Sequence, residues 1–127
     1  MNPDMKFATR VYLGAGIYGL IFLLPLYFLE ARTGRDFPPP ITHPEYYYGF
    51  IGVAVAWQLV FLVMSRDPIR YRALMIPSMV EKAAFGFPAI VLFAQGRLSP
   101  ATLGFGLIDM TLGVLFAIAY VKTRGGH

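Results

Sequence analysis

Four long apolar stretches constrain this sequence more than any other feature. A helix of roughly 20 apolar residues crosses the hydrocarbon core of a bilayer, where the backbone must satisfy its own hydrogen bonds. Only 14% of the 127 residues are charged, whereas a soluble domain carries about 25%. The sequence therefore predicts an all-α fold, an antiparallel bundle of four transmembrane helices at about residues 10–29, 44–64, 68–94 and 100–122.

These four helices use the whole length, so we expect one integral membrane domain over residues 1–127. Residues 30–45 contain three consecutive prolines and are expected to form the longest loop. Pro25 should bend the outer third of the first helix. A cleaved signal peptide is the alternative interpretation of the first stretch. Against it, the stretch is long, contains Pro25 and is followed by Glu30 rather than by a small-residue cleavage site.

Local signals mark several of the predicted helix ends. Asp67-Pro68 and Ser99-Pro100 each place a capping residue before a proline, which is typical of a helix start. Gly96 is expected to end the third helix, because glycine readily adopts the left-handed conformation found there. These signals place the third helix start at Pro68 and the fourth at Pro100.

The distribution of basic residues predicts the orientation, because cytoplasmic helix ends are enriched in Lys and Arg. Seven basic residues lie near the termini and the second connection: Lys6, Arg10, Arg66, Arg70, Arg72, Lys122 and Arg124. The opposite side holds three: Arg32, Arg35 and Arg97. We therefore expect a multi-pass protein of the cell (inner) membrane with both termini in the cytoplasm. Head-group binding by the residues 66–72 is a further option for the basic side.

A charged pair, Glu81-Lys82, interrupts the third apolar stretch, and Asp109 interrupts the fourth. At 1.5 Å per residue, each lies roughly 15–16 Å from its helix start. In a core about 30 Å thick, all three converge near the midplane. Because a short loop joins these two helices, they should be antiparallel neighbours, so Lys82 can contact Asp109 or Glu81. Which of Glu81 and Lys82 faces Asp109 stays open, since adjacent helical residues point about 100° apart.

Four further residues are candidates for the same network. Ser78 lies one turn before Lys82, and Trp57, Gln58 and Tyr18 fall at compatible depths on the first two helices. For Trp57 and Gln58, core packing is the structural alternative. On the fourth helix, a stripe of small and polar residues should face other helices rather than lipid. Its members are Thr102, Gly106, Asp109, Gly113 and Ala117.

The predicted cluster contains two carboxyl groups and one ammonium group. One carboxyl therefore has no matching cation, and a low-dielectric site favours its protonated form. Intramembrane charges usually mark functional sites. The structural alternative is that they only join helices, at about 0.6 kcal/mol for a typical intramembrane hydrogen bond.

Several classes of chemistry have no support in the sequence. The chain has no cysteine, which excludes disulfides and thiolate chemistry, and only two histidines, so we expect no metal site. Phosphate-binding, metalloprotease and serine hydrolase motifs are absent, and no catalytic residue can be named. We expect no cofactor and no nucleic-acid partner. The formal net charge of +4 reflects the basic helix ends instead.

One family resemblance spans nearly the whole chain. Asp67 to Arg72 reads D-P-x-R-x-R, and Lys82 and Asp109 lie in the third and fourth helices. With the helix count, these features resemble small bacterial four-helix integral membrane proteins, distantly similar to the DoxX-like group. The chain is also weakly similar to the EXPERA four-helix fold of sterol isomerases, which implies a lipophilic cavity with acidic and aromatic residues. No catalytic pattern of that family maps onto this sequence. The small multidrug exporters share the helix count, but their essential acid lies in the first helix.

Two functions follow as hypotheses. The first is a non-enzymatic membrane protein that binds a lipophilic molecule at the Glu81, Lys82 and Asp109 cluster. In another form of this hypothesis, it packs as a small subunit of a membrane complex or as a homo-oligomer. The second is proton-coupled transport or isomerisation of an apolar substrate, with the intramembrane carboxyls as proton donors. The bilayer is the expected surrounding in both.

Overall fold

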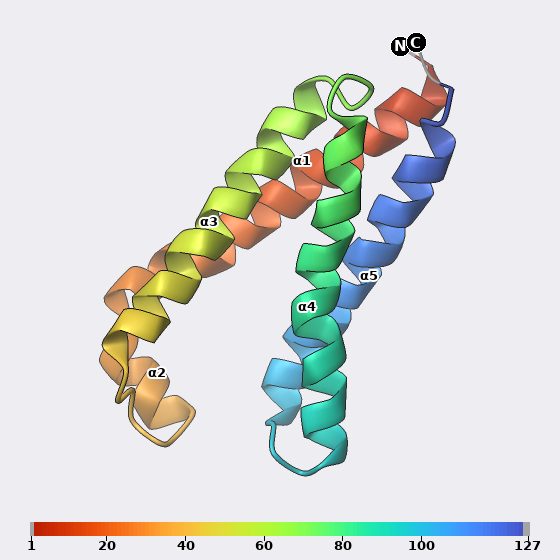
Figure 1. Ribbon diagram of the computed structural model, residues 1–127. Helices are drawn as coiled ribbons and strands as arrows, with labels where there is room; N and C mark the ends of the chain where they lie inside the picture. The colour runs from red at the N-terminus through yellow and green to blue at the C-terminus, as the bar shows by residue number, and fades with distance from the viewer. Residues whose placement is uncertain (1, 126–127) are drawn as a thin grey trace. The chain divides into compact units, whose positions relative to one another are not determined.

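The computed structural model describes residues 2–125, and the chain is 82% helical with no strand in that range (Figure 1). The predicted all-α class is therefore confirmed. The elements in order are α1 (Pro3–Leu23), η1 (Leu24–Phe28), α2 (Glu30–Asp36), α3 (Pro44–Arg66), η2 (Arg72–Leu74), α4 (Met75–Ala94) and α5 (Pro100–Lys122), where η denotes a 3₁₀ helix.

Four helical segments are long and apolar enough to cross a membrane: Pro3–Phe28, Pro44–Arg66, Arg72–Ala94 and Pro100–Lys122. Their length and composition are compatible with a multi-pass membrane protein. The first begins earlier than predicted, at Pro3 instead of Arg10. The reason is a cap at Asn2, whose side-chain oxygen accepts a hydrogen bond from the Met5 N–H at 2.8 Å.

The outer third of the first segment changes its helix type near Pro25, the position where a bend was predicted. α1 ends at Leu23, and the tighter 3₁₀ helix η1 continues to Phe28. Proline has no N–H to donate, so the regular hydrogen-bond ladder is interrupted here. The Leu29 N–H closes the 3₁₀ segment on the Leu26 carbonyl at 3.2 Å.

The prediction of a loop over residues 30–45 is wrong for its first half, which forms α2. The Thr33 N–H donates to the Leu29 carbonyl at 2.8 Å and starts the helix. Glu30 lies in the first turn, where a carboxylate opposes the helix dipole favourably. Arg32 and Asp36 form an i,i+4 ion pair at 3.4 Å. These local interactions make a two-turn helix before the prolines stop it.

The predicted start of the third membrane helix at Pro68 is also wrong. Residues 68–71 form a turn, η2 follows at Arg72, and α4 begins at Met75. Asp67 does cap, but it caps this turn, because its Oδ1 accepts the Arg70 N–H at 3.2 Å. An Asp-Pro pair favours a type I turn as well as a helix start, and here the turn forms.

The predicted end of the third membrane helix near Gly96 and the predicted start of the fourth at Pro100 are confirmed. Gly96 has φ of 72°, a left-handed conformation, and its N–H bonds to the Phe93 carbonyl at 2.9 Å. The Arg97 N–H bonds to the Leu92 carbonyl at 2.8 Å, which completes a Schellman motif. Ser99 then caps α5, accepting the Thr102 N–H at 3.2 Å, with proline at the first helical position.

The chain divides into two compact units, described separately below. The first combines Met1–Tyr12 with Met64–His127, and the second is Leu13–Val63. The single domain predicted over residues 1–127 stays a prediction.

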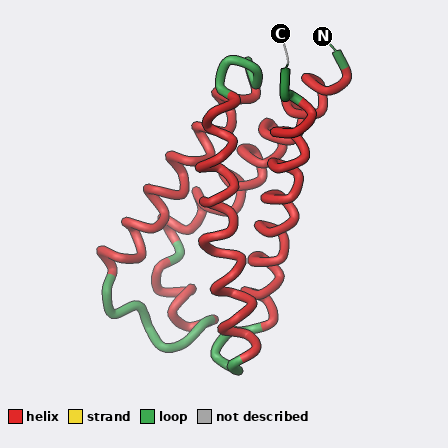
Figure 2. The backbone as a smooth tube through the Cα atoms, turned by 45° about the vertical axis from the view of Figure 1, so that its right-hand side comes forward, coloured by secondary structure: helices red, strands yellow, loops and turns green. Residues whose placement is uncertain are grey.

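In the first unit, α4 and α5 run antiparallel and side by side (Figure 2). One stripe of α4 is buried: Met75, Ser78, Lys82, Gly86 and Ala89. A Cβ added to Gly106 of α5 would lie 2.6 Å from the Ala89 Cβ, so the two backbones approach closely. Near the middle of α1, the Tyr12 ring stacks on the Phe116 ring of α5 with centroids 4.3 Å apart. This packing holds the charged residues of α4 against α5.

In the second unit, the small residues of α1 lie against α3. Added Cβ atoms at Gly16 and Gly19 would meet Leu62 and Gln58, respectively. Nearer the loop, the Tyr47 hydroxyl donates to the Leu26 carbonyl at 2.7 Å. Tyr47 therefore ties η1 to the start of α3.

Candidate functional site

The candidate site is a charge cluster of Glu81, Lys82 and Asp109. The Lys82 Nζ lies 3.5 Å from Glu81 Oε2 and 3.5 Å from Asp109 Oδ1. The predicted contact between Lys82 and the two carboxylates is therefore present. It also answers the question that the sequence left open: Lys82, rather than Glu81, faces Asp109.

Glycines on both helices allow close packing around the lysine. Lys82 belongs to the buried stripe of α4, whose next member is Gly86. A Cβ added at Gly113 of α5 would lie only 3.4 Å from the Lys82 Cβ, so the lysine stem passes over this glycine. A Cβ at Gly86 would collide with Met110. Gly106 and Gly113 of the predicted small-residue stripe thus face α4 rather than the outside.

The cluster is buried unequally. The Lys82 side chain is 3% exposed, whereas those of Glu81 and Asp109 are 20% and 19% exposed. Glu81 Oε2 is itself buried and has no partner at hydrogen-bond geometry within residues 2–125. The lysine is thus enclosed, while the two acidic side chains are partly exposed. The cluster has two carboxylates and only one ammonium, so it carries excess negative charge. Such a cluster can attract a cation, a hydrogen-bond donor or a proton.

Ser78 lies one turn before Lys82 on the same buried stripe. Its hydroxyl donates to the Leu74 carbonyl at 2.7 Å, in its own helix. The same hydroxyl lies 3.7 Å from the sulfur of Met64. Serine back-bonding of this kind is common in membrane helices and keeps the hydroxyl satisfied. Its role in a ligand site stays a prediction.

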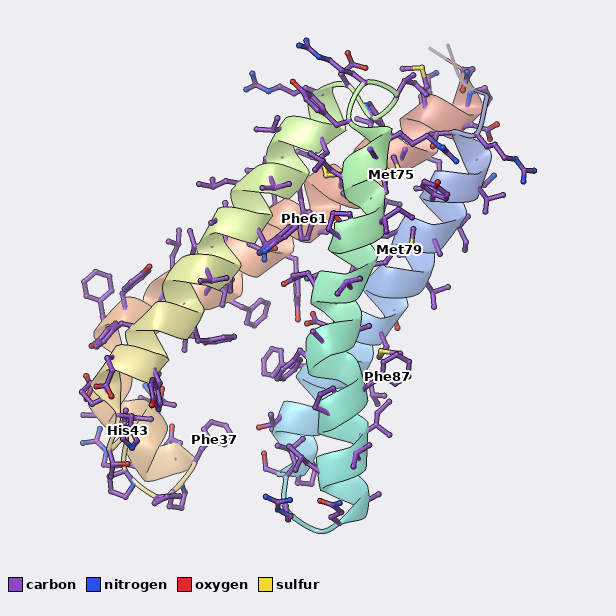
Figure 3. The ribbon with its side chains drawn as sticks, in the orientation of Figure 1. Phe37, His43, Phe61, Met75, Met79 and Phe87 are labelled. Carbon is purple, nitrogen blue, oxygen red and sulfur yellow. The ribbon has the colours of Figure 1, made fainter. Side chains whose placement is uncertain are left out.

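The other three predicted residues belong to the unit of residues 13–63. Gln58 is 2% exposed, and its Nε2 donates to the Ala54 carbonyl at 2.8 Å. The Trp57 ring lies 6.1 Å from that of Phe61, which is labelled in Figure 3. The Tyr18 ring lies 4.9 Å from that of Phe22. Their participation in the cluster stays a prediction.

Sequence reasoning missed the part that Arg72 plays, because it treated this residue only as a topology signal. Arg72 Nε and Nη2 donate to the Tyr120 carbonyl at 3.1 and 2.7 Å, and Nε also reaches Thr123 Oγ1 at 3.1 Å. Its guanidinium carbon lies 3.7 Å from the centroid of the Tyr120 ring. Thr123 in turn lies 3.9 Å from the sulfur of Met75, labelled in Figure 3. Arg72 thus caps the last turn of α5.

The described residues contain no group of three His, Cys, Asp or Glu side chains placed to hold a metal ion. Comparison of the chain with protein-family models, curated proteins and solved structures finds no match. The function must therefore be argued from the cluster itself.

Proposed function

We propose that this chain is a multi-pass protein of the cell (inner) membrane with both termini on the cytoplasmic side. The four long apolar helices and the seven-to-three division of basic residues support this orientation. A distant relation to the DoxX-like proteins is part of the proposal. It rests on the residues Asp67–Arg72, Lys82 and Asp109.

Within that frame, we propose that the protein binds the polar group of a lipophilic molecule at the cluster of Glu81, Lys82 and Asp109. The observation that carries the proposal is the partial exposure of both acidic side chains beside a buried lysine. A charge at membrane depth costs several kcal/mol unless a polar group covers it. Lys82 contacts one oxygen of each carboxylate. We infer that a second polar group binds the other side of these carboxylates.

The charge of the cluster indicates what that group is. Two carboxylates and one ammonium leave one negative charge, so an amine or a hydroxyl donor is favoured over an anion. The remainder of the ligand is expected to be apolar, because the same helix carries exposed hydrophobic side chains such as Val80 and Phe87. A lipid or other amphiphile with a cationic or donating head fits both conditions.

The test is retention of a native ligand by purified protein. Wild type, Asp109→Asn, Glu81→Gln and Lys82→Met would be purified in mild detergent, and bound molecules identified by native mass spectrometry after incubation with membrane lipid extract. Glu45→Gln is the matched control, because Glu45 is an exposed carboxylate outside the cluster. We expect the wild type and the control to retain a lipophilic molecule that raises the melting temperature, and the cluster variants to lose it.

Equal retention by all variants would contradict the ligand proposal. If a protein co-purifies with the wild type in place of a lipid, and Asp109→Asn releases it, the cluster serves a small subunit or homo-oligomer interface instead. If no molecule is retained and Asp109→Asn leaves the melting temperature unchanged, both forms of the proposal fail.

Proton-coupled transport or isomerisation is the second candidate, favoured by the unmatched carboxyl. It requires a protonated carboxylic acid inside the protein at neutral pH. Infrared spectra should then contain a protonated carboxyl stretching band that disappears in either Glu81→Gln or Asp109→Asn and persists in Glu45→Gln. The absence of this band from the wild type would remove the basis of the second candidate.

A further inference from the structure

The first compact unit has a strongly basic end, formed where α1 begins, α4 begins and α5 finishes. Two contacts bring these segments together. Lys122 Nζ lies 3.6 Å from Asp4 Oδ1, and Arg72 bonds to the Tyr120 carbonyl. Figure 2 shows the first turn of α1 and the last turn of α5 at this same end. Its basic residues are Lys6, Arg10, Arg66, Arg70, Arg72, Lys122 and Arg124.

The structure divides these seven residues into two groups. Arg72 is hydrogen-bonded to the end of α5. Lys122 forms an ion pair with Asp4, and its Nζ lies 5.3 Å from the centroid of the Phe7 ring. The other five are exposed and form no ion pair with any residue of the described range 2–125: Lys6, Arg10, Arg66, Arg70 and Arg124.

Acidic residues at this end compensate the five only in part. Asp4 pairs with Lys122, and the Asp67 carboxylate accepts the backbone N–H of Arg70 as a turn cap. The opposite helix ends differ: three basic residues there are matched by Glu30, Asp36 and Glu45, and Arg32 pairs with Asp36 at 3.4 Å. The first unit therefore carries an excess of positive charge at this end.

We propose that this basic end binds the phosphodiester head groups of acidic phospholipids. The ends of membrane-crossing helices lie at head-group depth, so the natural anion there is a lipid phosphate. The guanidinium forks of Arg66 and Arg70 can each grip a phosphate through two N–H groups. This site is independent of the charge cluster at Lys82, because it uses other residues and another ligand chemistry.

The experiment measures lipid selectivity in nanodiscs that contain equal amounts of phosphatidylglycerol and phosphatidylcholine. Both lipids carry the phosphodiester, but only phosphatidylglycerol has a net negative charge, so the comparison isolates electrostatic recognition. The double variant Arg66→Gln/Arg70→Gln is compared with Arg32→Gln/Arg35→Gln, which removes two charges from the opposite helix ends. Because both leaflets have the same composition, an inverted insertion would not change the result.

We expect native mass spectrometry to find phosphatidylglycerol enriched around the wild type and around the Arg32→Gln/Arg35→Gln control. For Arg66→Gln/Arg70→Gln, the selectivity should fall about tenfold or more. High salt should weaken the enrichment of the wild type, since surface charges are screened. Arg124→Gln, on a different helix, should lower it by a smaller factor.

Arg72 is left intact in every variant, because it holds the end of α5. Melting temperatures in pure phosphatidylcholine must match that of the wild type, and Arg124→Gln keeps the test available if the double variant unfolds. Equal retention of both lipids by the wild type would overturn the proposal. So would an equal loss of selectivity in the two double variants.

Discussion

Lys82 is a single residue whose position depends on its neighbours in three dimensions. Its stem packs against Gly113, and its ammonium lies 3.5 Å from a carboxylate oxygen of both Glu81 and Asp109. Removing one member of a buried charge cluster leaves the others uncompensated and typically costs about 3–5 kcal/mol. A change at Lys82 therefore affects folding as well as binding, which is why ligand retention, rather than stability alone, tests the function.

Arg72→Lys carries the first stability prediction. Lysine keeps the positive charge but cannot donate from two fork positions to the Tyr120 carbonyl and Thr123 while stacking on the Tyr120 ring. We expect the free energy of unfolding to fall by about 1–2 kcal/mol. Unfolding in mixed detergent micelles, followed by circular dichroism, measures it.

Arg70→Lys is the control for this change, because the Arg70 guanidinium only lies over the neighbouring Tyr71 ring, at 5.4 Å. It should be nearly neutral. If Arg72→Lys proved as neutral as Arg70→Lys, the positive charge alone, and not the hydrogen-bond geometry of Arg72, would be sufficient at the end of α5.

At the scale of elements, the glycines of α5 decide how closely it approaches α4. Gly106 faces Ala89 in the buried contact between the helices, whereas Gly104, two residues earlier, has nothing within 4 Å of an added Cβ. The two positions share a helix and a residue type, and they differ in what surrounds them. The same substitution at Gly104 and at Gly106 therefore distinguishes a change in helix propensity from a change in packing.

Gly106→Leu is expected to destabilise the protein relative to Gly104→Leu by about 1–3 kcal/mol, because the new side chain must push α4 and α5 apart. Both variants gain helix propensity by a similar amount, so the difference reports packing. Unfolding in mixed micelles gives both values. The close helix contact would be contradicted if Gly106→Leu proved as stable as Gly104→Leu.

At the scale of the whole molecule, the proposed orientation can be tested with single cysteines, because the natural chain has none. Thr42→Cys and Ala73→Cys are suitable, since both residues are exposed and neutral. Thr42 lies in the connection before α3, and Ala73 lies in η2 at the start of the third long segment, on the opposite proposed side. In intact cells, a membrane-impermeant thiol reagent should label Thr42→Cys and not Ala73→Cys, because positive charge retains residue 73 in the cytoplasm.

After permeabilisation, both variants should be labelled, which controls for reactivity. The reverse pattern in intact cells would mean that the termini are outside. Labelling of both positions in intact cells would contradict a single orientation.

Local sequence patterns were sufficient for most of the elements. Gly96 and Ser99 act within one turn of a helix end, so their effects on α4 and α5 could be predicted. Asp67 could not be assigned in the same way, because an Asp-Pro pair suits a turn as well as a helix start. The helix α2 was missed because the neighbouring prolines outweighed its i,i+4 pair and favourable end charges.

The sequence by itself determined the four apolar helices and brought Lys82 and Asp109 to one depth. Both follow from the length and composition of the apolar stretches and from the constant rise per residue of a helix. None of these quantities depends on which helices pack together. Only the tertiary structure decided that Lys82 faces Asp109 and that Arg72 closes the end of α5. The reason is that a side chain's direction depends on the rotation of its helix, and the packing of glycines against bulkier residues sets that rotation.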